Sequence, residues 1–203
     1  MRVNDWCSQI QNLFKTLKLE HIWNSEQVGL EKGWKILLKG KIQEREEKLW
    51  KIEMQKKNKL RLYRTIKFSL KREEYLDVIM DFEERRLVTA LRGGTNQLRV
   101  EVGRWKKEEL ADRTCTLCAM GDVEDELHAL FECPAYRRER QSWFLEIGRR
   151  TQYDFGKMVN DVEWMTHMTL GVGCMAKRER NEIQQQTGKF ISKLFKKRKL
   201  ILS

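Results

Sequence analysis

Apolar residues recur at helical spacing along most of this chain. In residues 5–19, for example, Trp6, Ile10 and Phe14 fall on one face of a helix. The chain contains a single proline, Pro134, so few residues interrupt the helical pattern. The sequence therefore predicts a mainly α fold.

The pattern continues, with two expected breaks, over the first half of the chain. A second helix is expected over residues 26–38, and Gly40 is expected to end it before a highly charged, largely exposed stretch at residues 41–58. Apolar residues then recur at helical spacing from Leu60 to Leu91. Gly93 and Gly94 follow directly, and this double glycine predicts the end of the helical series.

The pattern is less regular after the double glycine. Residues 98–102 alternate between apolar and polar types, which fits either a short strand or an extended approach to the cysteines that follow. One short helix is expected between Cys118 and Cys133. Pro134 then stands where a proline can open the next helix, which should reach Arg150.

The charge of the chain is strongly positive. Its 203 residues include 41 Lys and Arg against 30 Asp and Glu, a formal net charge of +11. Such a balance favours polyanionic partners, either nucleic acid or an acidic membrane surface. A solvated helical surface would explain the same composition without any partner.

Most of the excess charge lies at the C-terminus. Residues 177–203 carry nine basic and two acidic residues, a net charge of +7, and predict a basic amphipathic helix. This charge would suit contact with nucleic acid or another acidic surface. A helix that docks on the protein by its apolar side and leaves its charged side in water would explain the same pattern without a partner. The residues predicted to contact phosphates in this helix are Lys189, Lys193, Lys196, Lys197, Arg198 and Lys199.

Three cysteines and one histidine cluster in the spacing Cys115-x2-Cys118-x9-His128-x4-Cys133. Thiolate and imidazole ligands in such a set suit tetrahedral Zn²⁺. Four protein ligands leave no open position for a water molecule, so the predicted zinc is structural rather than catalytic. Small buried core residues are the alternative explanation. We refer to residues 114–133 as the knuckle.

The remaining cysteines, Cys7 and Cys174, are far apart in the sequence and are expected to be free buried thiols. An odd cysteine count without a disulfide framework indicates a reducing compartment, the nucleus or the cytoplasm, and not secretion. No apolar run has the length of a signal peptide or a membrane span, so we expect no membrane contact.

The knuckle is expected to be acidic and to repel phosphate. Between Cys115 and Cys133 there is no Lys or Arg, while Asp122, Glu124, Asp125, Glu126 and Glu132 contribute five negative charges. Phosphate contacts are therefore expected from its flanks instead. The flanking residues predicted for this role are Arg104, Lys106, Lys107, Arg113, Arg137, Arg138 and Arg140. Trp105 and Trp143 are candidates for base stacking, although aromatics at helical spacing more often belong to a core.

Residues 113–136, RTCTLCAMGDVEDELHALFECPAY, resemble the C-terminal zinc-knuckle region of reverse transcriptases from non-LTR retrotransposons. The shared features are a C-x2-C pair, a V-E-D-E-like acidic stretch, a histidine and a Cys-Pro pair. Upstream stretches, including residues 60–68 and 101–105, resemble the helical part that precedes the knuckle in animal elements. This resemblance implies a role in binding template RNA or target DNA during target-primed reverse transcription, with other retroelement proteins as partners.

The departures from that family are equally informative. Reverse transcription needs paired aspartates that bind two metal ions, and the sequence contains no Asp-Asp pair. No endonuclease or ribonuclease H carboxylate set stands out either. Cys115 and His128 could be imagined as nucleophile and base, but Cys118 and Cys133 at ligand spacing argue against it. We therefore expect no enzymatic activity.

Three regions follow from these patterns: a helical region at residues 1–94, the zinc-knuckle region with its following helix at 95–150, and a helical basic tail at 151–203. The leading hypothesis for function is a non-catalytic, zinc-binding accessory module that binds RNA or DNA. The alternatives are a structural or protein-interaction module and a non-functional retroelement remnant.

Overall fold

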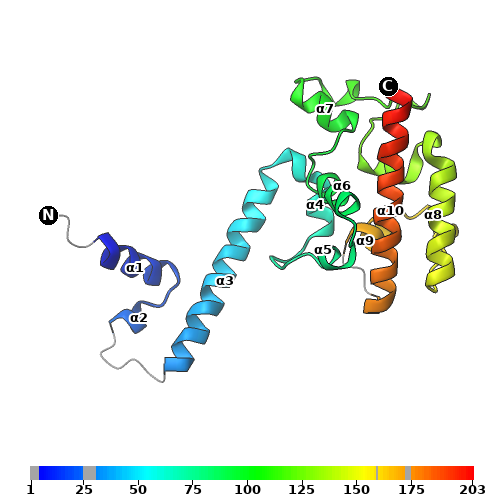
Figure 1. The fold of residues 1–203 in the computed structure, drawn as a ribbon. Coiled ribbons are helices and arrows are strands. Elements are labelled where there is room, and N and C mark those ends of the chain that lie inside the picture. The colour runs from blue at the N-terminus through cyan, green and yellow to red at the C-terminus, as the bar shows by residue number, and fades with distance from the viewer. Residues whose placement is uncertain (1–4, 25–30, 159, 172–174) are drawn as a thin grey trace. The chain divides into compact units, whose positions relative to one another are not determined.

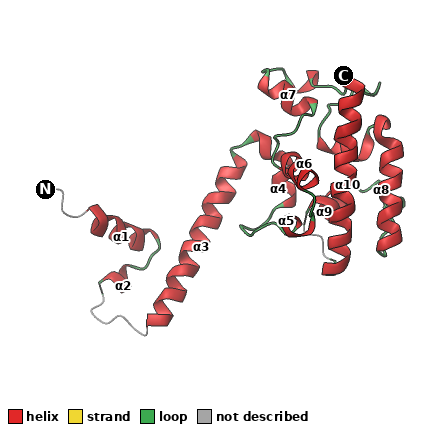
Figure 2. Ribbon diagram, in the orientation of Figure 1, coloured by secondary structure: helices red, strands yellow, loops and turns green. Residues whose placement is uncertain are grey.

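A computed structural model describes residues 5–24, 31–158, 160–171 and 175–203. The chain divides into two compact units, Met1–Lys56 and Lys57–Ser203. Helices make up the regular structure of both units, and the described residues contain no strand (Figure 2). The predicted mainly α fold is confirmed.

The first unit contains three helices, α1 (Asp5–Thr16), α2 (Glu20–Trp23) and α3 (Glu31–Gln55) (Figure 1). The ring centroids of Phe14 and Trp23 lie 5.8 Å apart and join α1 to α2. The helix expected over residues 5–19 is therefore present, although it ends three residues earlier than predicted.

Helix α3 continues through Gly40, so the break expected there is wrong. A Cβ atom at Gly40 would meet nothing within 4 Å, which shows that neither a tight turn nor a close contact requires this glycine. A glycine inside a helix costs only about 1 kcal/mol relative to alanine, and the Leu, Lys, Ile and Glu residues around it favour the helix. Residues 26–30 of the predicted second helix lie outside the described part of the chain.

The second unit is built around its last helix. The remaining α-helices are α4 (Arg61–Ile66), α5 (Tyr75–Val78), α6 (Phe82–Arg92), α7 (Arg99–Trp105), α8 (Arg137–Arg150), α9 (Val162–Leu170) and α10 (Lys177–Leu202). Helix α10 packs against α5, α6, α8 and α9 (Figure 1). Short 3-10 turns at Asn58–Leu60, Leu110–Asp112 and Pro134–Tyr136 and a π-helical turn at His128–Glu132 complete this unit.

Apolar side chains of α10 form the centre of the core. Ile183, Phe190, Ile191 and Leu194 are buried, and the ring of Phe190 stacks on that of Trp143 at 4.2 Å between centroids and 7° between planes. The basic tail is thus a docked helix with a solvated back. Helix α10 packs against helices from all three regions predicted from the sequence, so these regions share one core.

Glycines end the helical series where the sequence predicts. Helix α6 begins after Asp81, whose carboxylate accepts a hydrogen bond from the Glu84 amide at 2.8 Å, and ends at Gly93. Gly94 has a φ of +61°, and a Cβ atom there would overlap the carbonyl of Lys59. The turn that leads toward the knuckle therefore requires a glycine at this position.

The alternating residues 98–102 form the start of α7, so neither the strand nor the extended approach is present. The side chain of Asn96 accepts from the Leu98 amide at 3.0 Å, and the carboxylate of Glu124 accepts from the Arg99 amide at 2.9 Å. These bonds satisfy donors at the helix start. Helix α7 thus depends on a contact from the knuckle, which the local alternation of residues does not contain.

Among the described residues, no helix combines the length and the apolar character needed to span a membrane.

Candidate metal centre

The four predicted ligands converge in the structure. The Sγ atoms of Cys115, Cys118 and Cys133 and a ring nitrogen of His128 all lie within 4.8 Å of one another. Cys115 and Cys118 lie in the loop at the start of the knuckle. His128 is the first residue of the π-helical turn near its end, and Cys133 directly follows that turn. These four side chains could hold a metal ion.

The spacing of the donor atoms fits a tetrahedral ion. The Sγ atoms of Cys115 and Cys133 are 3.9 Å apart, and Cys118 Sγ lies 3.5 Å from His128 Nε2. Tetrahedral Zn–S and Zn–N bonds imply separations of about 3.8 Å between two sulfurs and about 3.6 Å between sulfur and nitrogen. A disulfide would need about 2.05 Å between the sulfurs, so Cys115 and Cys133 are two separate thiols.

Backbone hydrogen bonds shape the loop that carries the first two cysteines. Thr114 and Val123 form an isolated antiparallel bridge, and the Cys115 amide donates to the carbonyl of Asp122 at 2.8 Å. Gly121, at a φ of +77°, turns the chain between them. The C-x2-C pair is therefore held in a short closed loop.

The turn that carries the histidine is fixed from both ends. The carboxylate of Asp125 accepts from the His128 amide at 2.8 Å. The buried guanidinium of Arg140, on α8, donates to the carbonyls of Leu130 and Cys133, each at 2.8 Å. Arg140 therefore braces the turn, and its burial corrects the expectation that it contacts phosphate.

The ring of His128 is oriented for a ligand at Nε2. Its Nδ1 is buried without a hydrogen-bond partner and lies 3.7 Å from a carboxylate oxygen of Glu132. Metal-binding histidines commonly donate a hydrogen bond from their second nitrogen to a carboxylate. Glu132 is the carboxylate beside this nitrogen, although 3.7 Å is longer than a hydrogen bond.

Burial changes the proton affinity of the cysteines. It raises the pKa of Cys115 to about 12 and also raises the pKa of Cys133. Without a metal, both thiols carry their protons at neutral pH, and metal binding must displace them. Protonated buried thiols are poor nucleophiles, which argues against the enzymatic alternative that used Cys115.

Two of the five acidic residues in the knuckle are inside the protein. Glu124 is fully buried and accepts from Arg198 of α10 at 3.0 and 2.7 Å. Glu126, which is 2% exposed, accepts from Arg61 at 2.7 Å and from Asn96 at 3.1 Å. The knuckle is therefore less acidic than its five carboxylates suggest, because cations from distant segments neutralise two of them.

Two cations of α10 that were predicted to contact phosphate form ion pairs within the protein. Arg198 is buried against Glu124, which corrects its assignment as a phosphate contact. Lys197 is half-buried and binds both carboxylate oxygens of Glu139 at 2.9 Å. Both side chains attach α10 to the rest of the unit.

Four lysines of α10 remain free of such contacts. Lys189, Lys193, Lys196 and Lys199 are exposed, and the described residues supply no ion pair to any of them. We refer to these four residues as the lysine row. Their spacing of three or four residues places them along one side of the helix over about 15 Å.

The cations that flank the knuckle differ in their availability. Arg104 binds the buried carboxylate of Glu101 at 2.6 Å, and Arg113 donates to two backbone carbonyls, those of Glu108 and Val100. The other four, Lys106, Lys107, Arg137 and Arg138, are exposed and have no ion pair within the described part of the chain. Their predicted contacts with phosphate stay predictions.

Two further sequence expectations concern aromatic and thiol side chains. Trp143 is buried in the core, so it does not stack on bases, whereas Trp105 is 53% exposed. Cys7 is exposed, so the expectation of a buried thiol is wrong there. Cys174 lies outside the described residues.

Comparisons of the chain with protein-family models, with curated proteins and with solved structures each found no match. The functional argument therefore rests on the residues of this chain and on their geometry.

Proposed function

We propose that this chain is a non-enzymatic module that binds structural zinc and uses the lysine row to bind RNA or DNA. The observation that carries the proposal is the contrast within α10. Its arginine at position 198 is buried in an ion pair, whereas the four lysines are exposed and form no ion pair within the described residues, although the carboxylate of Glu84 on α6 interacts electrostatically with three of them. Unpaired cations on one side of a rigid helix suit a polyanion.

Zinc is the metal that the donor set favours. Three thiols and one imidazole are soft to borderline ligands, which suit Zn²⁺ better than Mg²⁺ or Ca²⁺. Four protein donors close a tetrahedral shell and leave no position for a water nucleophile, so the proposed role is structural. The proposal includes no catalytic activity for the chain.

Binding through the lysine row would be driven mainly by counterion release. Each phosphate that a lysine neutralises frees condensed cations into solution, so affinity falls as salt rises. Phosphate contacts carry no sequence information by themselves. The proposed binding is therefore strongly dependent on salt and weakly dependent on sequence.

The resemblance to the C-terminal region of non-LTR retrotransposon reverse transcriptases supports the same proposal. In that family the region lies beside a polymerase, which this chain lacks because its sequence has no paired aspartates. By that resemblance, the chain would assist template RNA or target DNA binding in the nucleus or cytoplasm, with other retroelement proteins as partners.

A protein-interaction module is the second candidate, and exposed apolar side chains of α3 favour it. Ile36 is 74% exposed, Ile52 53% and Leu49 43%. Association through such side chains would depend little on salt, in contrast to phosphate binding.

Two variants with the same loss of positive charge are compared to test the proposal. In the first, the four residues of the lysine row become Gln; in the matched control, the exposed Lys39, Lys48, Lys51 and Lys57 become Gln. Both variants lower the net charge by the same amount. Fluorescence anisotropy with a single-stranded RNA and a DNA duplex at one fixed low salt concentration measures their affinities.

We expect the lysine-row variant to lose roughly a hundredfold or more in affinity, because each phosphate contact contributes on the order of 1 kcal/mol at low salt. The control should retain nearly all of its affinity. Equal losses in the two variants would mean that only net charge matters, and would contradict a binding surface on α10.

A further inference from the structure

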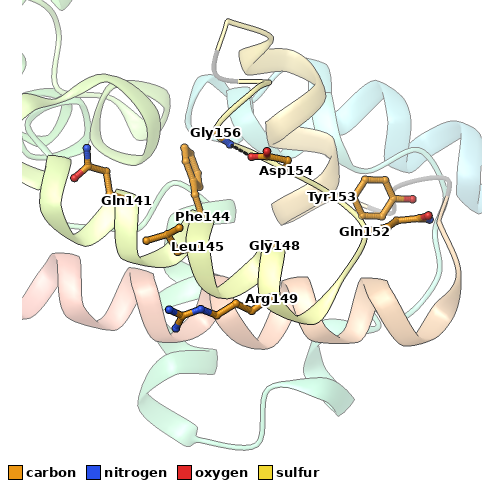
Figure 3. Close-up of a pocket in the computed structure, with 9 residues that line it drawn as sticks. All are labelled: Gln141, Phe144, Leu145, Gly148, Arg149, Gln152, Tyr153, Asp154 and Gly156. Atoms are coloured by element: carbon orange, nitrogen blue, oxygen red, sulfur yellow. Dashed lines mark hydrogen bonds between the residues drawn. The ribbon is translucent and has the colours of Figure 1, made fainter.

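A groove opens beside α8, and its lining residue Gln152 donates a hydrogen bond to Glu179 of α10 at 3.3 Å. The groove has a volume of about 620 Å³ and lies between α8 and residues 152–156 (Figure 3). Its lining combines aromatic, aliphatic, amide and guanidinium groups, chiefly from Gln141, Phe144, Leu145, Arg149, Gln152 and Tyr153. This volume lies within the range of small-molecule sites in proteins.

The core holds the aromatic lining in place. Phe144 packs edge-on against Phe155 at 5.7 Å between ring centroids and lies 5.1 Å from Trp143. Tyr153 lies 6.1 Å from Trp164. In Figure 3, the ring of Phe144 rises from α8 toward the segment that carries Asp154 and Gly156. A ligand would therefore meet a preformed aromatic surface, and ordering it would cost little.

The mouth of the groove combines an exposed apolar side chain with an amide. Leu145 is 61% exposed although it lies beside the aromatic lining. Gln141 stands one turn before it on α8 and can both donate and accept hydrogen bonds. A planar ligand with polar edges would cover Leu145 and Phe144 and would satisfy Gln141.

Arg149 lines the groove, and Arg138 lies outside the lining, three residues before Gln141 on α8. Arg138, Leu145 and Arg149 follow one another along one side of α8, and the two arginines are about 16 Å apart along the helix axis. Arg138 is exposed and has no ion pair among the described residues, and Arg149 shares an exposed pair with Glu146. The carboxylate in the lining, that of Asp154, is offset by Lys157 at 3.4 Å. Negative groups on both sides of a planar ligand therefore complement this surface.

We infer that the groove binds a base of single-stranded nucleic acid, with neighbouring phosphates held by Arg138 and Arg149. Proteins that bind single strands combine aromatic platforms with basic flanks, and a base in a duplex cannot reach a platform of this kind without leaving its stack. The inference rests on the proposed function and adds a second contact surface to it, on a different helix from the lysine row.

Titration with a single nucleotide tests the groove in a variant that no longer has the lysine row. The probe is adenosine 5′-monophosphate alone, added to the zinc-loaded lysine-row variant and followed by the amide signals of an NMR spectrum. We expect saturable shifts at Gln141, Leu145 and Gly156, and their loss in Leu145→Glu. No shift at these residues would overturn the inference, and would leave an apolar partner segment as the occupant of the groove.

Oligonucleotide binding gives the second measurement, with otherwise unaltered protein. Leu145→Glu should weaken binding of a single strand by about tenfold, the loss expected for one stacked base, and leave duplex binding unchanged. The matched control is Leu110→Glu, since Leu110 is 56% exposed and lies far from α8 in the sequence. It should change neither affinity.

The two proposals fail in different ways. Equal weakening of single-strand and duplex binding by Leu145→Glu would overturn the groove as a base site, and so would unchanged single-strand binding. Neither result affects the lysine row. Absence of oligonucleotide binding by the unaltered protein would overturn the proposed function, while the nucleotide titration would still decide whether the groove takes a base.

Discussion

The knuckle is acidic and α10 is basic, and the two regions use their charges differently. In the knuckle, the charges of Glu124 and Glu126 are buried in ion pairs with cations from other segments. In α10, one cation is buried in this way, at Arg198, while the lysine row stays in water. The net charge of a segment thus says little about the charge that a partner would meet.

The two regions are also joined to each other. The pair between Glu124 and Arg198 links the knuckle to α10 across 74 positions of sequence, and Glu124 also holds the first amide of α7. Removing one member of a buried pair typically costs about 3–5 kcal/mol, whereas exposed pairs contribute about 0–1 kcal/mol. Buried charge should therefore determine stability, and exposed charge should determine binding.

The largest expected effect is that of metal removal. Ala129, Leu130, Phe131 and Cys133 belong to the same core as α8 and α10, so loss of the metal should destabilise the whole second unit. We expect Cys118→Ser or a strong chelator to lower the free energy of unfolding by roughly 5 kcal/mol or more. Thermal unfolding and amide hydrogen exchange measure the change.

Cys7→Ser is the matched control for this prediction, since Cys7 is exposed and lies outside the metal cluster. It should leave the unfolding curve unaltered. A chelated protein that keeps its melting temperature and its protection in α8 and α10 would show that the four side chains are ordinary core residues.

The next effect is that of breaking the buried pair. Arg198→Ala leaves the carboxylate of Glu124 buried without its cation, and should cost about 3–5 kcal/mol in denaturant unfolding. Its neighbour Lys197 provides the control. The pair of Lys197 with Glu139 is partly exposed, so Lys197→Ala should cost about 1 kcal/mol or less. Similar losses for both variants would remove the distinction between buried and exposed charge in α10.

The metal affinity should depend steeply on pH. Burial raises the pKa of the Cys115 and Cys133 thiols, so at neutral pH both are protonated without metal and must lose their protons on binding. Affinity should therefore rise with pH between pH 7 and 8, by at least about a hundredfold from these two displaced protons alone, or about 2.7 kcal/mol. Competition with a calibrated chelator measures it. An affinity that is constant over this range would contradict thiolate ligands from Cys115 and Cys133.

The smallest expected effect is that of the lysine row on stability. These side chains are exposed and form no ion pair, so replacing all four by Gln should change the free energy of unfolding by about 0.5 kcal/mol or less per residue. Denaturant unfolding of the variant provides the measurement. A large loss would mean that the lysines support the fold, and would weaken the case for a binding surface.

The sequence predicts the metal ligands well because their spacing is local. Cys115, Cys118, His128 and Cys133 lie within nineteen residues, so the pattern alone brings them together. The helices are also predictable, because their apolar periodicity is local. The exceptions, Gly40 inside α3 and the alternating start of α7, arise where neighbouring helix formers or a distant carboxylate outweigh the local signal.

The buried charges could not be predicted from the sequence, because their partners come from elsewhere in the chain. Glu124 lies in an acidic run and Arg198 in a basic one, and each run by itself predicts exposure. Arg140 resembles the exposed Arg137 and Arg138 in sequence, although it is the one that braces the metal turn. In each case, contacts between distant segments determine which charged side chain is buried and stabilises the structure.

The most direct test of the account is the salt dependence of nucleic-acid binding. The logarithm of the affinity for a DNA duplex, plotted against the logarithm of the salt concentration, has a slope of about −0.9 for each phosphate neutralised. Replacing the lysine row with Gln should flatten this slope by about 3 to 4, and replacing Lys39, Lys48, Lys51 and Lys57 should leave it nearly unchanged. An unaltered slope in the lysine-row variant would contradict the account.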